Sequence, residues 1–188
     1  MRSIKGNLVT LELLNIEKHA RGYFEVSQDE NVHKYMGNTV PENIDEIIKL
    51  LKKYEMYFIN WVIISNETQE VIGIIRLGKP EEENGMLVAG ESQVLSSKYW
   101  RKGHMKETKG LFYRYVFGDL SVDVLFADVW EDNINSIKSL EYYGYKLVDT
   151  VDEVFSKTGR KAKKYIYKLT KQDYQSLPCV RGGGTAKP

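Results

Sequence analysis

The chain has 188 residues and a formal net charge of +1, from 27 basic and 26 acidic side chains. That length predicts one domain, large enough to bury about 70% of the surface of its unfolded chain. The balanced charge does not favour binding to nucleic acid or to a membrane surface. No apolar run approaches the ~20 residues that cross a bilayer, and the N-terminal segment lacks the apolar core of a signal peptide. We therefore expect a cytoplasmic protein.

The cysteines and histidines indicate neither a disulfide nor a metal site. Cys179 is the sole cysteine, which excludes an internal disulfide and suits a reducing compartment. His19, His33 and His104 are not spaced as metal ligands. We expect no metal cofactor.

The first half of the chain alternates between strand patterns and amphipathic helix patterns. Residues 8–13 predict a strand and residues 16–27 a helix. A second helix is predicted to begin at residues 39–41, where proline stands in the first turn and acidic residues follow. Two apolar runs at 60–65 and 71–77, joined by a polar turn, predict a β-hairpin.

The second half continues this alternation and ends in a glycine-rich tail at residues 173–188, which we expect to be disordered. The predicted elements are a charged turn at 80–84, a strand at 86–95, a helix ending near 117, a strand at 121–129, a helix at 133–143, a strand at 145–155, a turn at 157–160 and a strand ending near 169.

A cluster of basic residues surrounds the start of the helix that follows the strand at 86–95. Unpaired N–H groups and the positive end of the helix dipole already lie there, so further cations cost ~0.3–1 kcal/mol each unless an anion binds. A strand that leads through a glycine turn into a helix is a common way to hold phosphate. The alternative is an ordinary solvated helix face. The cluster comprises Lys98, Arg101, Lys102, His104, Lys106 and Lys109, around Gly103.

Two motifs, one at this turn and one further along the chain, carry a resemblance to a known family. The motifs are Tyr99-Trp100-x-Lys102-Gly103-x-Met105, and Asn133-x-x-Ser136 followed by Leu140-Glu141-x-x-Gly144-Tyr145. Their order resembles the acetyl-CoA core of the GNAT N-acetyltransferase superfamily, in the branch of the ribosomal-protein N-terminal acetyltransferases. The resemblance implies one domain over residues 1–172. It also implies an α/β fold, with a seven-stranded mixed sheet, about four helices, and strands four and five splayed apart.

The resemblance implies that acetyl-CoA is the co-substrate. Its pantetheine arm would pair with the end of the fourth strand, and backbone amides from Arg101 to Met105 would face the pyrophosphate. Basic side chains of the turn would reach phosphate oxygens, and Gly103 would let the backbone approach closely. The implied cofactor-binding residues are Leu95, Ser96, Ser97, Arg101, Lys102, Gly103, His104, Met105, Lys106, Asn133 and Ser136.

Asn133 and Ser136 each have two interpretations. Asn133 is suited to cap the helix that follows it, with Ser136 in the first turn. The resemblance also places both beside the CoA thiol, where the Ser136 hydroxyl would protonate the departing thiolate. Many GNAT enzymes use a tyrosine as this acid, at the position that Leu140 occupies here. Tyr142 and Tyr143 flank that position and are expected to be core or helix-surface residues.

Direct attack on the thioester needs a neutral amine, yet amines with pKa values of about 7–10 are mostly protonated near neutral pH. A carboxylate, or a water held by one, must take a proton. An N–H group must also stabilise the oxyanion, and we expect it from the backbone of residues 95–97. Glu91 and Glu153 are the candidate bases; the alternative for each is an exposed strand carboxylate. No cysteine or Ser-His-Asp arrangement indicates a covalent intermediate.

Three functions stay open at this point. The chain acetylates a protein N-terminus, or a small amine such as a polyamine, amino sugar or antibiotic, or it is a catalytically silent CoA-binding module. Leucine in place of tyrosine at position 140 keeps the third possibility open. We expect a monomer or homodimer without a nucleic-acid or membrane partner. The first two helices and the last hairpin would enclose the acceptor, with an aromatic lining drawn from Tyr35, Met36, Tyr54, Tyr57, Phe58 and Trp61.

Overall fold

The computed structural model describes residues 3–36 and 39–178. Its contacts define two compact units, Met1–Pro80 with Gly90–Ser121, and Glu81–Ala89 with Val122–Pro188. Strand β6, Met86–Leu95, contributes residues to both. The single domain expected over residues 1–172 stays a prediction. Gly37, Cys179 and most of the expected tail lie outside the described residues.

The sheet of the first unit is antiparallel throughout, with strand order β1-β2-β3-β4-β6. Side chains are buried along most of β3 and β4, which indicates cover on both faces of these strands. The hairpin predicted at residues 60–77 is confirmed. The strands of this unit, besides β6, are β1 (Ile4–Lys5), β2 (Val9–Leu13), β3 (Phe58–Ser65) and β4 (Val71–Gly78).

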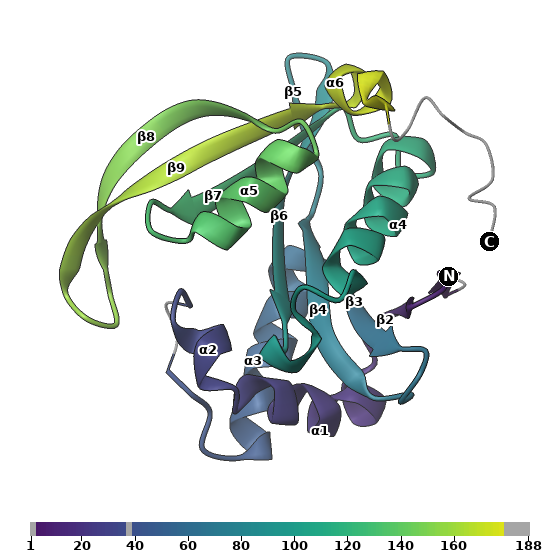
Figure 1. Ribbon diagram of the computed structural model, residues 1–188, viewed down its shortest axis with the longest axis vertical. Helices are drawn as coiled ribbons and strands as arrows, with labels where there is room; N and C mark the ends of the chain where they lie inside the picture. The colour runs from purple at the N-terminus through teal and green to yellow at the C-terminus, as the bar shows by residue number, and fades with distance from the viewer. Residues whose placement is uncertain (1–2, 37–38, 179–188) are drawn as a thin grey trace. The chain divides into compact units, whose positions relative to one another are not determined.

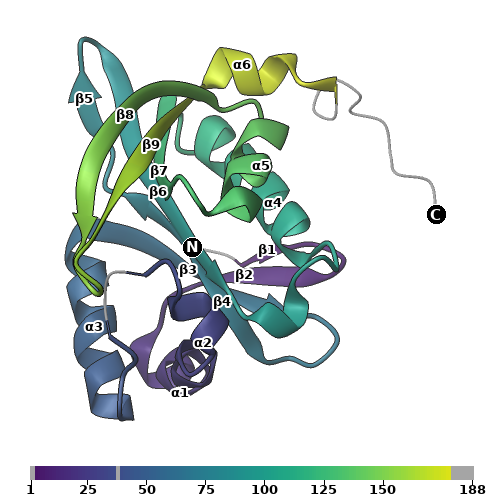
Figure 2. The same ribbon diagram turned by 60° about the vertical axis from the view of Figure 1, so that its left-hand side comes forward.

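Helices α1 (Ile16–Ser27) and α3 (Ile44–Tyr57) cover one face of this sheet (Figure 2). The bounds predicted for α1 are confirmed, and the short helix α2 (Glu30–His33) was not predicted. The predicted start of α3 at residues 39–41 is wrong. Asn43 is the N-cap, because its side chain accepts a hydrogen bond from the Glu46 N–H, and α3 begins only after it.

Helix α4 (His104–Gly118) covers the other face, where Phe112 packs edge-on against Trp61 of β3 at 5.5 Å between ring centroids (Figures 1 and 2). The short 3₁₀ helix η1 (Ser97–Tyr99) leads from β6 toward it. The Glu107 carboxylate ties the first turn of α4 to the start of β2. It accepts hydrogen bonds from the backbone N–H groups of Asn7, Leu8 and Val9, at 2.8, 2.6 and 2.9 Å.

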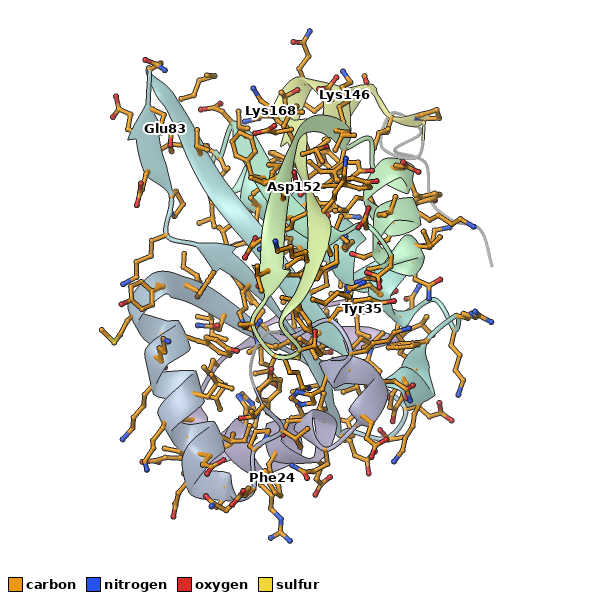
Figure 3. All side chains as sticks on the ribbon, turned by 90° about the vertical axis from the view of Figure 1, so that its left-hand side faces the viewer. Phe24, Tyr35, Glu83, Lys146, Asp152 and Lys168 are labelled. Atoms are coloured by element: carbon orange, nitrogen blue, oxygen red, sulfur yellow. The ribbon has the colours of Figure 1, made fainter. Side chains whose placement is uncertain are left out.

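The second unit is an antiparallel arrangement in which β9 lies between β7 and β8. The turn predicted at residues 80–84 is instead strand β5, which pairs with β6 and whose side chains, including Glu83, are exposed (Figure 3). Lys146 Nζ, at the start of β8, lies 2.6 Å from Asp173 Oδ1 of α6. The elements are β5 (Glu81–Glu83), β7 (Val124–Trp130), α5 (Ile134–Tyr142), β8 (Lys146–Phe155), β9 (Arg160–Thr170) and α6 (Lys171–Ser176).

The described residues thus form a mixed α/β structure with nine strands, where the sequence predicted seven. The two additional strands, β1 and β5, are two and three residues long. The same part of the chain holds six α-helices rather than about four, because α2 and α6 are short helices without an apolar periodicity to indicate them. Across residues 3–36 and 39–178, no helix has both the length and the apolar character needed to cross a membrane.

Candidate functional site

The glycine turn before α4 has the backbone conformation of an anion-binding loop. Gly103 is the N-cap of α4 with a φ of +86°, in the left-handed region that favours glycine. No side chain among the described residues caps this helix start. The first N–H groups of α4 are therefore left for a ligand or solvent, which is the arrangement that binds phosphate in proteins.

The basic cluster around this turn divides into exposed and buried members. Lys98, Arg101, Lys102 and Lys106 are exposed, as a phosphate site requires. His104 is buried, with its ring 5.0 Å from the ring of Tyr99 in an edge-on contact. Lys109 is fully buried as well, so the interpretation of the whole cluster as one solvated helix face is wrong.

Arg101 also has a left-handed backbone, with a φ of +58°. A left-handed backbone at an L-residue destabilises the folded protein by roughly 1–2 kcal/mol. Glycine removes this strain, but its more flexible unfolded chain offsets about 0.5–1 kcal/mol of the gain. We expect Arg101→Gly to raise the free energy of unfolding by about 0.5–1 kcal/mol in urea denaturation. Lys102→Gly is the matched control, since Lys102 has no positive φ, and it should lower stability. A loss of stability in both variants would contradict the strain at Arg101.

At the end of β6 the backbone N–H of Ser96 points toward β4 and that of Leu95 points away from it. The Ser96 N–H donates to the Ile72 carbonyl of β4 at 2.9 Å, and Leu95 lies opposite Gly73. Because N–H groups alternate in direction along an antiparallel strand, the Leu95 N–H points away from β4. The Leu95 carbonyl accepts a hydrogen bond of 2.7 Å from Trp100 Nε1.

Asp29, a residue that the sequence did not single out, holds the turn after β6. Its Oδ2 accepts the Ser97 N–H at 2.7 Å, and its Oδ1 accepts the Asn31 N–H at 3.1 Å. Partial burial acts to raise the pKa of Asp29, but the hydrogen bonds from Ser97 and Asn31 outweigh it and hold the pKa below its ordinary value. Since Ser96 and Ser97 already donate their N–H groups, Leu95 is the remaining backbone donor among the three predicted positions.

Glu91 lies on the opposite side of β6 from Ser92 and faces α4. Its Oε1 accepts a hydrogen bond from the Tyr113 hydroxyl at 2.9 Å and lies 3.4 Å from Lys109 Nζ. The side chains of Glu91 and Lys109 are both 0% exposed. Glu91 Oε2 is buried without a hydrogen-bond partner in the described part of the chain. The alternative interpretation of Glu91 as an exposed strand carboxylate is therefore wrong.

In the second unit, Asn133 and Ser136 open helix α5. Asn133 is the N-cap, and its side chain accepts the Ser136 N–H at 3.4 Å, which confirms the capping interpretation. Ser136 itself is partly exposed. Leu140 is buried, as is Tyr143, whereas Tyr142 is half exposed on the helix surface. The interpretation of the two tyrosines as core and surface residues is confirmed.

Glu153 lies on β8 and belongs to a charged group on one face of this unit. Its side chain is 48% exposed, and its Oε2 lies 3.3 Å from Lys164 Nζ. Lys164 Nζ also lies 2.6 Å from Asp128 Oδ2. Partial burial acts to lower the pKa of Lys164, but the contacts with Asp128 and Glu153 outweigh it and raise that pKa. Glu153 is thus an exposed strand carboxylate whose partner is a cation.

The predicted site residues fall into two groups that lie in different units. Glu91, residues 95–97 and the glycine turn belong to the first unit, and the structure brings them together at the end of β6 and the start of α4. Asn133, Ser136 and Glu153 belong to the second unit. No group of three or more His, Cys, Asp or Glu side chains in the described residues could hold a metal ion.

Comparison with known proteins shows the family of the chain. The family model of the acetyltransferase (GNAT) domain matches residues 9–146. The chain is 26% identical over 179 residues to an uncharacterized N-acetyltransferase p20 of Bacillus licheniformis, covering 93% of this chain and 99% of that protein.

Two solved structures show the same fold. A GCN5-related N-acetyltransferase from Brucella melitensis has a TM-score of 0.81 at 21% identity, covering 93% of this chain and 81% of the other. A ribosomal-protein-S5-alanine acetyltransferase from Vibrio fischeri has a TM-score of 0.75 at 12% identity, covering 93% of this chain and 99% of the other.

Proposed function

Because the chain belongs to the GNAT acetyltransferase family, we propose that it transfers the acetyl group of acetyl-CoA to the amine of a protein N-terminus. The observation that carries the cofactor part of this proposal is the glycine turn. It combines a left-handed Gly103, a helix start without a side-chain cap among the described residues, and exposed cations. The acceptor part follows the likeness to the ribosomal-protein acetyltransferase of Vibrio fischeri and the sequence motifs.

In this proposal the residues of the turn hold the phosphates and the end of β6 holds the pantetheine arm. The amides from Arg101 to Met105 face the pyrophosphate, with Lys102 and Lys106 as charge partners. His104 contributes through its position against Tyr99, which supports the turn. Of the predicted positions 95–97, Leu95 pairs with the arm, because Ser96 and Ser97 already donate their N–H groups. Asn133 and Ser136 are proposed to lie beside the thiol.

The reaction is a direct attack in a ternary complex. The amine nitrogen forms a bond to the thioester carbonyl carbon, the carbon–sulfur bond breaks, the amine loses a proton to a base and the thiolate gains one from an acid. The Leu95 N–H, directed away from β4, is the proposed donor to the carbonyl oxygen. Ser136 is the proposed acid.

Glu153 and Glu91 are the two proposed bases, and their surroundings differ. Glu153 is half exposed, so a proton taken from the amine can pass on to water. Glu91 is enclosed with Lys109 and Tyr113, but its Oε2 lacks a partner among the described side chains. We favour Glu153 because a base must exchange its proton in every turnover. Glu153→Gln should then lower kcat by ~10²-fold or more, whereas a loss of that size only in folded Glu91→Gln would reverse the assignment.

Turnover with a panel of acceptors tests the proposed function. Release of the CoA thiol is followed with N-terminal peptides, with polyamines and with amino sugars. Faster release with peptides supports the proposal, and faster release with a small amine assigns the alternative acceptor. Acetyl-CoA binding in calorimetry without release for any acceptor would indicate a silent module. No detectable binding at millimolar acetyl-CoA would contradict the cofactor part.

Gly103 gives a direct test of the phosphate site. Asparagine and aspartate both tolerate a left-handed backbone and have the same shape. Gly103→Asp and Gly103→Asn should therefore lose similar stability, because a Cβ there meets only Leu8 Cδ1, at 3.2 Å. The aspartate adds a negative charge beside the phosphates, where one contact is worth ~1–3 kcal/mol. We expect calorimetry to show acetyl-CoA affinity at least about tenfold weaker in Gly103→Asp than in Gly103→Asn. Equal affinities would place the phosphates elsewhere.

A further inference from the structure

A buried arginine without an acidic partner lies on the face of the first unit's sheet that α1 and α3 cover. Arg76 of β4 is 5% exposed. Its Nη2 donates to the Tyr23 hydroxyl at 2.8 Å, its Nη1 lies 3.4 Å from Ser92 Oγ, and its guanidinium lies 4.0 Å from the centre of the Tyr54 ring. No ion pair among the described residues includes Arg76, and Nε has no hydrogen-bond partner there.

A second polar atom without a partner lies beside it. Asn60 of β3 is opposite Arg76, and Arg76 is opposite Ser92 of β6, so the three side chains form a row across neighbouring strands. Asn60 is buried, and its Oδ1 lacks a hydrogen-bond partner in the described residues. Burying the Arg76 charge without an acidic partner among the described residues, and with its Nε–H unpaired there, is unfavourable, and a ligand carboxylate can accept that N–H.

The neighbours of Arg76 on β6 and α3 reach the surface of the first unit. Ser92 and Tyr54 are both partly exposed, although Arg76 between them is buried. Ser92 lies three residues before Leu95, the proposed donor to the thioester carbonyl, which is roughly 10 Å along a strand. In an extended peptide a side chain two or three residues from the N-terminus lies at a comparable distance from the α-amine.

We propose that Arg76 binds a carboxylate of the acceptor, so that the enzyme prefers N-termini with an acidic residue at the second or third position. A planar guanidinium is the side chain best suited to pair with a carboxylate. The Ser92 hydroxyl belongs to the same row and is a further hydrogen-bond donor for the carboxylate. The Tyr54 ring contacts the face of the guanidinium and fixes its orientation. This inference rests on the proposed function, because it concerns the acceptor of the same reaction.

Peptides that differ only by Glu or Gln at the second or third position test the preference, since the pair keeps the size of the side chain and the α-amine. We expect wild-type kcat/KM to be at least about tenfold higher for the Glu peptide. Arg76→Met should bring this ratio close to one. Arg114→Met is the control, because Arg114 is exposed on α4, and it should keep the wild-type ratio. Equal kcat/KM values for the Glu and Gln peptides in the wild type would overturn the inference while leaving the proposed function standing.

A second measurement needs no turnover. Because Arg76 has no acidic partner among the described residues, Arg76→Met should lower stability by no more than the loss of its hydrogen bonds to Tyr23 and Ser92. The Glu peptide should raise the Tm of the wild type more than the Gln peptide does, and should lose this advantage in Arg76→Met. If Arg76→Met does not fold, the Tm of the wild type with the two peptides decides. Equal Tm shifts would make Arg76 a structural residue satisfied by Tyr23 and Tyr54 and would overturn the inference, whereas a larger shift with the Glu peptide supports it.

Discussion

Glu91→Gln is expected to lower the free energy of unfolding by ~3–5 kcal/mol. Glu91 and Lys109 lie 3.4 Å apart with both side chains fully buried, so the substitution leaves the Lys109 ammonium without its counter-ion. Glutamine keeps the size of the side chain and can still accept the Tyr113 hydroxyl, which isolates the effect of the charge. Urea denaturation followed by far-ultraviolet circular dichroism measures the change.

A double-mutant cycle separates the pair from its surroundings. Lys109→Met alone should also destabilise, because it leaves the Glu91 carboxylate buried without the ammonium. The double variant Glu91→Gln/Lys109→Met should be more stable than either single variant, since no uncompensated charge remains. Tyr113→Phe is the control that removes one hydrogen bond without changing charge, with an expected loss of about 1–3 kcal/mol. Additive single effects in the double variant would show that Glu91 and Lys109 do not act as a pair.

Two elements could be predicted from sequence with the bounds that the structure has. The bounds of α1 and of β6 agree with the prediction because each has an apolar pattern ended by a clear signal. The hairpin of β3 and β4 was predicted as a pair, but β3 begins two residues earlier than predicted and β4 ends one residue later. The start of α3 was misplaced because proline at position 41 is a typical first-turn residue, but Asn43 offers a side-chain acceptor for the helix N–H groups and determines where the helix begins.

The glycine turn could be predicted, but the partners of its neighbours could not. Local sequence indicates a phosphate site at Gly103, because glycine, cations and a helix start are adjacent along the chain. Lys109 belongs to the same run of basic residues, yet its partner Glu91 is on a different strand, and only the packing of α4 on β6 brings them together. Asp29 likewise reaches Ser97 from a loop far away in sequence.

The row around Arg76 also depends on contacts between residues that are far apart in the sequence. Asn60, Arg76 and Ser92 come from three strands, and their alignment depends on the register of two strand pairs. In the sequence Arg76 follows an apolar run, where an arginine is typical of the exposed end of a strand. Its burial against Tyr23 and Tyr54 follows only from the packing of α1 and α3.

Ser136→Ala is expected to lower kcat by ~10²-fold or more, the range for a general acid, while the KM for acetyl-CoA stays within a few-fold. Leucine occupies position 140, where many members of the family have a tyrosine that acts as the general acid, so the thiolate needs another proton donor. The substitution leaves helix α5 capped, because Asn133 accepts the backbone N–H of residue 136, which alanine keeps. Unchanged circular dichroism and Tm would confirm that α5 is intact.

Ser139→Ala on the same helix is the matched control for loss of a hydroxyl, and we expect it to keep the wild-type kcat. A thioester with a leaving group of lower pKa gives an independent readout, because a good leaving group needs no acid. Its turnover should fall much less in Ser136→Ala than turnover of acetyl-CoA does. If Ser136→Ala keeps near-normal kcat with both thioesters, solvent protonates the thiolate, and the rate enhancement comes chiefly from holding amine and thioester together.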